Sequence, residues 1–271
     1  MSSIHPTAVI DKEAIIDPQA QIGPYCIVGR AAQIGAGTVL RSHVVIGDEV
    51  IIGKDNVFYP YCVIGSRPQI LGFKEQVTVG SVVIGDGNTF REYVTIHRSK
   101  YSGCSTKIGN HNLLMVGAHV GHDCVLEDHI VMTNYVQVAG HCHIETGAWL
   151  SGLVGIHQFV TIGRWAYAAG MTSITRDVPP FVVVSGSYPT KVRGVNVRGL
   201  IRAGLNREQQ KRIIAAFKEL YRKGGPLLTK AQELAQQDGL DENVRAMVEA
   251  IHRSSQHRYG RFLECTRNAR S

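Results

Sequence analysis

Apolar residues recur at every sixth position through much of this sequence. A first series runs from Ile4 to Ile64, and a second runs from Ile108 to Ile174. A period of six fits neither the 3.6-residue repeat of a helix nor the two-residue alternation of an ordinary strand. It is typical of a solenoid of short strands and turns, in which three hexads close one triangular coil. The pattern therefore predicts an all-β solenoid of hexapeptide repeats.

The other positions of the hexad agree with this prediction. Glycine often follows the apolar residue, and four positions after that residue the side chains are mostly small or β-branched. Small residues fit where three walls converge on a narrow axis. Cys26, Cys62, Cys124 and Cys142 all occupy this small interior position. We therefore expect buried thiols there, rather than disulfides or metal ligands.

The hexad phase breaks at two segments and ends before the last third of the chain. Residues 66–82 and 98–107 cannot be placed as hexads, and we interpret them as loops extruded from the coil. Beyond Pro189, the residues Asn206, Thr229 and Asp241 each precede a helical pattern and are expected to cap it. The sequence thus predicts a β-helix over residues 1–189 and an α-helical domain over residues 190–271.

Charge divides unevenly between these two regions. Residues 1–189 carry 12 basic and 14 acidic side chains, whereas residues 190–271 carry 17 basic and 8 acidic ones. A basic helical domain favours an acidic partner, such as an acidic carrier protein or a phosphate-bearing substrate. Neither a nucleic-acid-binding motif nor stacking aromatic residues accompany the charge, so we expect no nucleic acid partner.

Membrane insertion and secretion are not expected from the sequence. No apolar stretch is long enough to span a bilayer, so we expect no integral membrane segment. The first residues, MSSIHPTAVIDKE, lack the basic and then apolar plan of a signal peptide. We therefore expect a cytoplasmic protein.

Four of the twelve histidines fall where the coils would bring them together. The coil geometry places them near one corner of successive coils, about 4.8 Å apart along the axis. They are His119, His122, His141 and His157. Three interpretations are open: a general base that accepts a proton near neutral pH, a zinc site of three imidazoles and a water, or a polar ladder with a structural role.

Four segments resemble a known enzyme family. AHVGHDC at 118–124, GIHQF at 155–159, RDVPPF at 176–181 and GVNVRGLIRAG at 194–204 resemble the UDP-N-acetylglucosamine 3-O-acyltransferases of lipid A biosynthesis. The resemblance implies a left-handed parallel β-helix and a homotrimer with active sites between subunits. It also implies transfer of a 3-hydroxyacyl chain from acyl carrier protein to the 3-position of the UDP-sugar. No metal or separate cofactor is implied, because the 4′-phosphopantetheine arrives on the carrier protein.

The resemblance also implies roles for particular residues. His122 matches the general base, Asp123 the acidic residue that supports it, and Gly140 the glycine whose N–H stabilises the oxyanion. Gly170 matches the position that gauges acyl length, although neighbouring Met171 could shorten the channel. The other positions match substrate-binding residues of the family: Gln69, Lys74, His119, His141, His157, Gln158, Asn196, Arg198 and Arg202.

Two departures from the family pattern leave the acceptor open. The first loop reads Pro-Gln-Ile-Leu-Gly-Phe from Pro68 to Phe73, where the family usually has PQDLK and an aromatic residue, and Lys74 follows it. Arg198 stands where glutamate is usual. A relative acting on another sugar nucleotide, such as a 3-amino analogue, is therefore an alternative. A zinc-dependent enzyme like the γ-type carbonic anhydrases and a non-catalytic scaffold for carrier protein are further alternatives.

Overall fold

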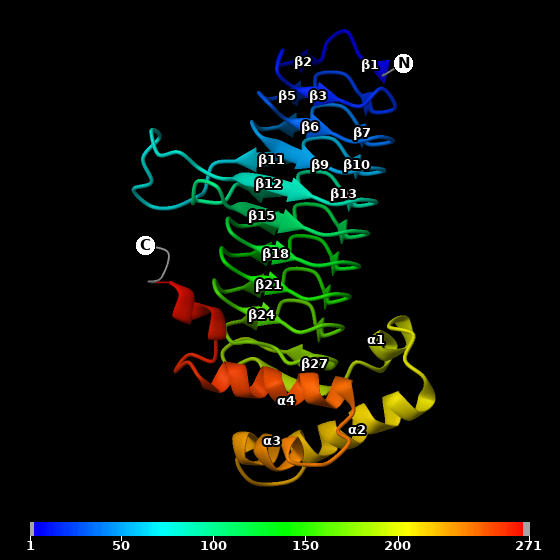
Figure 1. Cartoon of the computed structure of the whole chain (residues 1–271), viewed down its shortest axis with the longest axis vertical. Coiled ribbons are helices and arrows are strands. Elements are labelled where there is room, and N and C mark those ends of the chain that lie inside the picture. The colour runs from blue at the N-terminus through cyan, green and yellow to red at the C-terminus, as the bar shows by residue number, and fades with distance from the viewer. Residues whose placement is uncertain (1–2, 268–271) are drawn as a thin grey trace.

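The computed structural model describes residues 3–267, which form a triangular β-helix followed by a helical domain (Figure 1). Up to Ile174, successive strands belong to three sheets in turn, so each strand pairs in parallel with the strand one coil away. Three hexads per coil, as the sequence predicts, explain this order. The fold class expected from the hexad period is confirmed.

The strands of each sheet follow one another along the helix axis. Sheet I contains β1 (Ser3–Ile4), β4 (Gln21–Ile22), β7 (Val39–Leu40), β10 (Val57–Phe58), β13 (Thr89–Phe90), β16 (Leu113–Leu114), β19 (Val131–Met132), β22 (Trp149–Leu150), β25 (Tyr167–Ala168), β27 (Val182–Ser185) and β28 (Lys191–Val195). Sheet II contains β2 (Val9–Ile10), β5 (Ile27–Val28), β8 (Val45–Ile46), β11 (Val63–Ser66), β14 (Thr95–His97), β17 (His119–Val120), β20 (Gln137–Val138), β23 (Gly155–Ile156) and β26 (Ser173–Ile174). Sheet III contains β3 (Ile15–Ile16), β6 (Gln33–Ile34), β9 (Val50–Ile52), β12 (Ser81–Ile84), β15 (Ser105–Ile108), β18 (Val125–Leu126), β21 (His143–Ile144) and β24 (Thr161–Ile162).

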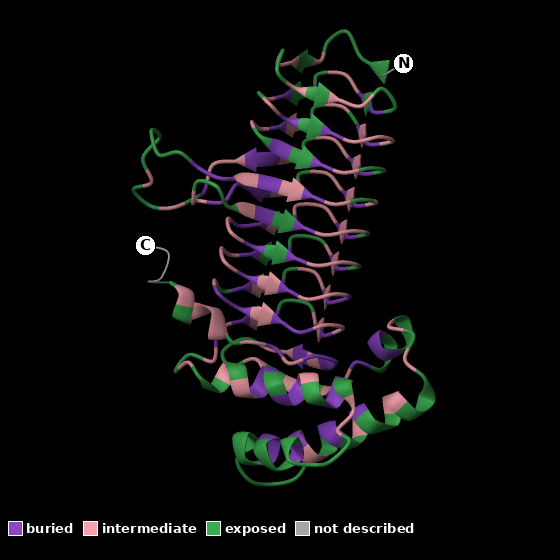
Figure 2. Cartoon of the chain, in the orientation of Figure 1, coloured by how far each residue is buried: buried purple, intermediate pink, exposed green. Residues whose placement is uncertain are grey.

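The apolar hexad residues point into the coil and form its core (Figure 2). From Ile22 onward these residues are buried, whereas Ile4 in the first coil remains exposed because no coil covers it. The rings of Phe58 and Phe90 stack in the core with centroids 4.5 Å apart. A two-residue strand cannot bury such a face alone, so each coil depends on its neighbours.

The four cysteines of the small interior position are buried and free, as expected. The thiol of Cys124 lies 3.1 Å from the carbonyl oxygen of Ala139, to which it donates. Burial raises the pKa of the Cys62 thiol to about 12. These cysteines are therefore core residues.

The two predicted loops leave the coil between sheets II and III. The first spans 67–80, between β11 and β12, and the second spans 98–104, between β14 and β15. Each is shorter than predicted, because Ser81 and Ser105 already pair with each other in sheet III. Figure 1 shows the first loop, in cyan, projecting from the side of the helix.

The helical domain begins later than the sequence suggests. β28 (Lys191–Val195) still pairs with β27 in sheet I, although antiparallel, and the expected boundary at residue 189 falls between these two strands. The helices are α1 (Val197–Arg202), α2 (Arg207–Tyr221), α3 (Leu227–Ala235), α4 (Glu242–Ser255) and the 3-10 helix η1 (Phe262–Thr266). Within residues 3–267, none of the helices has both the length and the apolar character needed to cross a bilayer.

Two of the three predicted helix caps are confirmed. Asn206 caps α2 in a reciprocal capping box with Gln209, and Asp241 caps α4 by accepting from the Asn243 N–H. The prediction for Thr229 is wrong, because α3 already begins at Leu227, directly after Pro226. The fixed backbone angle of proline suits the start of a helix, and this outweighs the capping preference of threonine.

We predict that Phe58→Ala destabilises the coil far more than a substitution on its surface. Phe58 is fully buried, so truncation leaves a cavity and is expected to lower the free energy of unfolding by ~3–5 kcal/mol. Ile51→Ala is the control, because Ile51 lies in sheet III with its side chain partly exposed, and it should cost less than about 1 kcal/mol. Urea unfolding followed by circular dichroism measures both. Equal losses would contradict the stacked core.

Candidate active site

The corner between sheets II and III brings His122 and Asp123 into contact. Neighbouring residues of an extended strand point to opposite faces. Here the two residues form a turn, in which Asp123 adopts a left-handed conformation with φ of 61°. His122 Nδ1 consequently lies 2.7 Å from Asp123 Oδ2. With its proton on Nδ1, His122 donates to the carboxylate and leaves the lone pair of Nε2 available.

Asp123 is held by several further groups. Its Oδ1 accepts a hydrogen bond from the Ser99 hydroxyl at 2.5 Å, and its Oδ2 accepts the Lys100 N–H at 3.3 Å. His141 Nε2 lies 3.8 Å from the same Oδ2. Burial alone would raise the pKa of the Asp123 carboxyl, but hydrogen bonds from His122 and Ser99 outweigh it and lower the pKa below its usual value. Asp123 is therefore a carboxylate at neutral pH.

The register of the coils explains the neighbours of this pair. β17 pairs with β20, so Gly140 takes the place beside His122 and His141 the place beside Asp123. A Cβ added to Gly140 would lie 2.7 Å from both Cε1 and Nε2 of His122, so only glycine leaves room for the imidazole. In the next coil, the ring of Phe159 stacks on that of His141, with centroids 4.5 Å apart.

A cleft of about 470 Å³ opens over this corner and the outer face of sheet II. We call it the histidine cleft. Its floor follows His119, Gln137, Gly155 and Ser173, which are in register on four successive strands. Its lining includes Gln69, His97, His119, His122, Gly140 and His157.

His97 was not singled out from the sequence, yet it lines this cleft. Its ring lies edge-to-face against that of His119, with centroids 4.8 Å apart, and His119 Nδ1 is 2.8 Å from Thr95 Oγ1. Burial lowers the pKa of both imidazoles, that of His97 to about 4. The extruded loop after His97 hides its coil spacing. If Thr95 is paired with His119, the register of the coil places His97 next to this corner.

A second cleft, of about 800 Å³, lies on sheet I beside α1. We call it the tryptophan cleft, and its lining includes Trp149, Tyr167, Arg198 and Arg202. The Arg202 guanidinium sits 4.5 Å from the centre of the Trp149 ring. Burial lowers the pKa of Arg202, which still leaves this side chain cationic at neutral pH.

Asn196 also lines the tryptophan cleft, but its side chain has structural partners. Its Oδ1 accepts the Gly199 N–H at the start of α1, and its Nδ2 donates to the Trp165 carbonyl at 2.8 Å. The amide is thus occupied at both ends. Asn196 fixes the position of the helix that carries Arg198 and Arg202.

The structure therefore separates the expected site residues into groups. His119, His122, Gly140, His157 and Gln69 line the histidine cleft, while His141 and Asp123 lie behind it. Asn196, Arg198 and Arg202 line the tryptophan cleft on another face. Lys74 is exposed and lines neither cleft of the single chain, and Gly170 lies in a turn where Met171 is 75% exposed.

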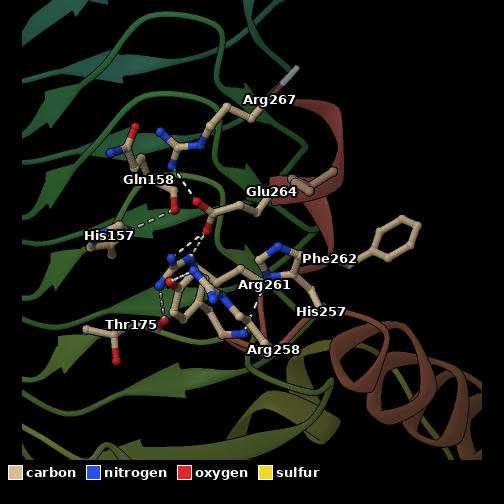
Figure 3. A network of polar contacts seen from close by, with 12 residues as sticks. His157, Gln158, Thr175, His257, Arg258, Arg261, Phe262, Glu264 and Arg267 are labelled. Carbon is tan, nitrogen blue, oxygen red and sulfur yellow. Dashed lines mark hydrogen bonds and ion pairs between the residues drawn. The ribbon is translucent and has the colours of Figure 1, made fainter. Parts of the chain in front are cut away.

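The C-terminal segment runs beside His157 and Gln158 (Figure 3). Arg261 is buried and donates to the Thr175 carbonyl at 3.0 Å and to Glu264, which also accepts from Arg267. The Arg267 guanidinium lies 4.5 Å from the centre of the Phe159 ring. Gln158 lies in the same region, where its carbonyl oxygen is 3.0 Å from His157 Nδ1. The segment thus supports the stack of Phe159 and His141.

One group of side chains has a composition suited to a metal ion. Ligand atoms of His122, Asp123 and His141 lie within 4.8 Å of one another. The contact between His122 and Asp123 at 2.7 Å is, however, a hydrogen-bond distance. The geometry accordingly favours a proton between these two groups.

We predict that His97 stays neutral down to an unusually low pH. An unperturbed histidine takes up a proton near pH 6.5, whereas burial keeps the folded His97 neutral until about pH 4. Because the unfolded chain binds this proton first, His97 makes the fold less stable as pH falls through that interval. A ¹H–¹³C titration of the imidazole Cε1–H resonances, assigned with His97→Gln, measures this. A midpoint near 6.5 would contradict it.

Comparisons with known proteins relate the chain to a family of acyltransferases. Residues 177–260 match the family model described as "Udp N-acetylglucosamine O-acyltransferase; Domain 2". The chain is 44% identical over 202 residues to an acyl-[acyl-carrier-protein]–UDP-N-acetylglucosamine O-acyltransferase of Gloeothece citriformis, an alignment that covers 74% of this chain and 71% of that protein. It is 45% identical over 179 residues to the protein of that name from a Synechocystis strain, covering 66% of this chain and 64% of that protein.

Solved structures extend the likeness over nearly the whole fold. The UDP-N-acetylglucosamine acyltransferase of Francisella novicida superposes with a TM-score of 0.87 at 37% identity, covering 92% of this chain and 91% of that one. The UDP-N-acetylglucosamine O-acyltransferase of Moraxella catarrhalis gives a TM-score of 0.85 at 41% identity, covering 91% and 95%. The coil is a left-handed β-helix, as the resemblance implied. The chain belongs to the UDP-N-acetylglucosamine O-acyltransferase family.

Proposed function

We propose that this protein transfers a 3-hydroxyacyl chain from acyl carrier protein to the 3-hydroxyl of UDP-N-acetylglucosamine, the first step of lipid A biosynthesis. The observation that carries the proposal is the hydrogen-bonded pair of His122 and Asp123 on the histidine cleft, with Gly140 beside it. The curated relatives are named for this activity.

His122 acts as the general base. Its Nδ1–H is directed to the Asp123 carboxylate, so Nε2 accepts the proton of the acceptor hydroxyl as that oxygen attacks the thioester carbonyl. The imidazolium that forms is stabilised by the adjacent carboxylate. It then returns its proton to the departing thiolate of the phosphopantetheine. The thioester is already activated, so the reaction requires neither a metal ion nor a covalent intermediate.

Gly140 supplies the oxyanion donor. Within residues 3–267, its N–H donates no hydrogen bond to another protein group. The glycine lies directly beside His122 Nε2, close to where the thioester carbonyl would be attacked. A fixed backbone N–H at this place stabilises negative charge as it develops on the carbonyl oxygen.

A homotrimer would join the two clefts into one site. The histidine cleft lies on sheet II and the tryptophan cleft on sheet I, so one chain cannot bring them together. In a threefold ring each subunit presents one face to each neighbour. The corner shared by sheets I and II would then face the axis. Large side chains along that corner are about half exposed or more: Tyr25, Tyr61, Tyr93, Tyr135, Leu153 and Met171.

In that arrangement, residues of the tryptophan cleft would bind the UDP-sugar acylated at the neighbour's His122. Arg202 is a cation on an apolar wall, which suits a diphosphate beside a stacking base. Arg198 lies on the same helix and adds a second cation where the family usually has glutamate. The acceptor could therefore be UDP-N-acetylglucosamine or its 3-amino analogue, and we favour the former because of the relatives' names.

The charge of the helical domain supports acyl carrier protein as the acyl donor. Residues 190–271 carry an excess of nine positive charges, from 17 basic and 8 acidic side chains, and an acidic carrier would be attracted to them. A medium to long acyl chain is expected, because Gly170 stands at the position that gauges acyl length in the family and has no side chain to limit it. The cytoplasmic location expected from the sequence stays a prediction.

We predict that purified protein acylates UDP-N-acetylglucosamine and that His122→Ala lowers kcat by ~10²–10⁴-fold. The assay is mass spectrometry of the product formed from mixed 3-hydroxyacyl carrier proteins and UDP-sugars, including the 3-amino analogue. His157→Ala is the comparison, because His157 lines the same cleft but is 3.0 Å from a backbone carbonyl rather than a carboxylate. Turnover of neither sugar would contradict the proposal, and stoichiometric zinc would favour the metal-dependent alternative.

We predict that two inactive variants restore each other when co-expressed. If each site combines His122 of one subunit with Arg202 of the next, random trimers of His122→Ala and Arg202→Ala chains contain about a quarter of intact sites. Activity should then return to about a quarter of the wild-type level. Separately purified variants, mixed without exchange of subunits, serve as the control. No recovery in verified mixed trimers would place both residues in the site of one chain.

A further inference from the structure

The second extruded loop, residues 98–104, reaches back to the corner that carries His122. Ser99 is the point of contact: its side chain is fully buried, and its hydroxyl lies 2.5 Å from Asp123 Oδ1. We propose that Ser99 is a positioning residue, which orients the Asp123 carboxylate so that its other oxygen accepts the His122 Nδ1 proton. This role rests on the proposed function of the pair as base and support.

The backbone of Ser99 is fixed on both sides. The Gly80 N–H donates to the Ser99 carbonyl at 2.9 Å, and the Ser99 N–H donates to the Ser81 carbonyl at 3.3 Å. Arg98, the preceding residue, is buried and donates to the Gly80 carbonyl and to Glu49 Oε2, the latter at 2.6 Å. The end of the first loop and the start of the second therefore hold one another, and Ser99 has little freedom to move.

The hydroxyl proton of Ser99 has one preferred acceptor. The hydroxyl oxygen accepts the Tyr101 N–H at 3.1 Å, which leaves its single proton to donate. The Tyr101 carbonyl lies 3.2 Å away, whereas the charged carboxylate oxygen of Asp123 is at 2.5 Å. A charged acceptor at shorter distance forms the stronger hydrogen bond. The proton is thus directed to Asp123.

This contact sets the orientation of the carboxylate. With Oδ1 held by Ser99, rotation about the Cβ–Cγ bond is restrained, and Oδ2 stays 2.7 Å from His122 Nδ1. That bond in turn keeps the proton of the neutral imidazole on Nδ1 and the lone pair on Nε2. Ser99 touches no substrate atom in this scheme, so its effect must pass entirely through Asp123.

The neighbouring pair of Ser81 and Ser105 provides a matched control. Their hydroxyl oxygens are 2.7 Å apart where the first and the second loop rejoin sheet III, and among the described contacts neither hydroxyl bonds Asp123. Ser105→Ala removes a serine hydroxyl from the loop base without altering the carboxylate. It should leave kcat and KM unchanged, so any general effect of loosening the loop is measured separately.

The test is a double-mutant cycle with Asp123→Asn. Ser99→Ala should lower kcat about tenfold, the value of one hydrogen bond to a charged group, with the KM values of both substrates unchanged. In the Asp123→Asn background the same substitution should have no further effect, because the group through which Ser99 acts is already altered. Equal losses in both backgrounds, raised KM values, or an equal loss in Ser105→Ala would overturn the proposal.

A second measurement does not depend on turnover. The downfield ¹H resonance of the His122 Nδ1 proton, identified by its absence in His122→Ala, should shift upfield or broaden in Ser99→Ala and stay unchanged in Ser105→Ala. An unchanged resonance in Ser99→Ala would overturn the positioning role even if the wild-type protein acylated no sugar. Conversely, a shifted resonance without turnover would refute the acyltransfer function and leave the role of Ser99 intact.

Discussion

Stacking of short strands, one coil upon the next, is the constraint on which this molecule depends. Each strand of the coil has two to four residues. Only the coils before and after it supply hydrogen-bond partners for its backbone and bury its apolar side chain. The same stacking fixes where every outward side chain lies. A residue at one hexad position is always next to the residue at that position in the adjacent coil. The candidate active site is one consequence of this stacking, because Gly140 falls beside His122 and His141 beside Asp123.

The corner chemistry shows how a regular scaffold produces an irregular group of side chains. Three successive coils place an aspartate, a histidine and a phenylalanine at one left-handed turn position, with φ values of 61°, 62° and 66° for Asp123, His141 and Phe159. The carboxylate is therefore supported by an imidazole and the imidazole by an aromatic ring. The pair that performs the proposed chemistry, His122 and Asp123, consists of neighbours in sequence that only a turn can bring together.

Much of this could be predicted from the sequence, because a period of six residues has few structural solutions. The coil, its core residues, the two extruded loops and the gathering of His119, His122, His141 and His157 all follow from spacing. His97 and Ser99 do not follow from the hexad count alone, and His97 would have required pairing Thr95 with His119 across the loop. They stand next to a loop of irregular length, so their distance in sequence from the other site residues says nothing about register. The local preference of Thr229 predicts a cap there, but Pro226 has the stronger effect and the helix begins directly after it.

The extruded loops have a consequence for how such a chain can change. After 67–80 and 98–104, the strands rejoin their neighbours in register, as the pairing of Ser81 with Ser105 shows. Length can therefore vary in these segments without disturbing any coil. Inside a hexad the opposite holds, because one residue inserted between His122 and Gly140 would shift every later side chain by one position. New specificity is thus free to accumulate in the loops, while the spacing of the corner that carries His122 admits substitutions but no change of length.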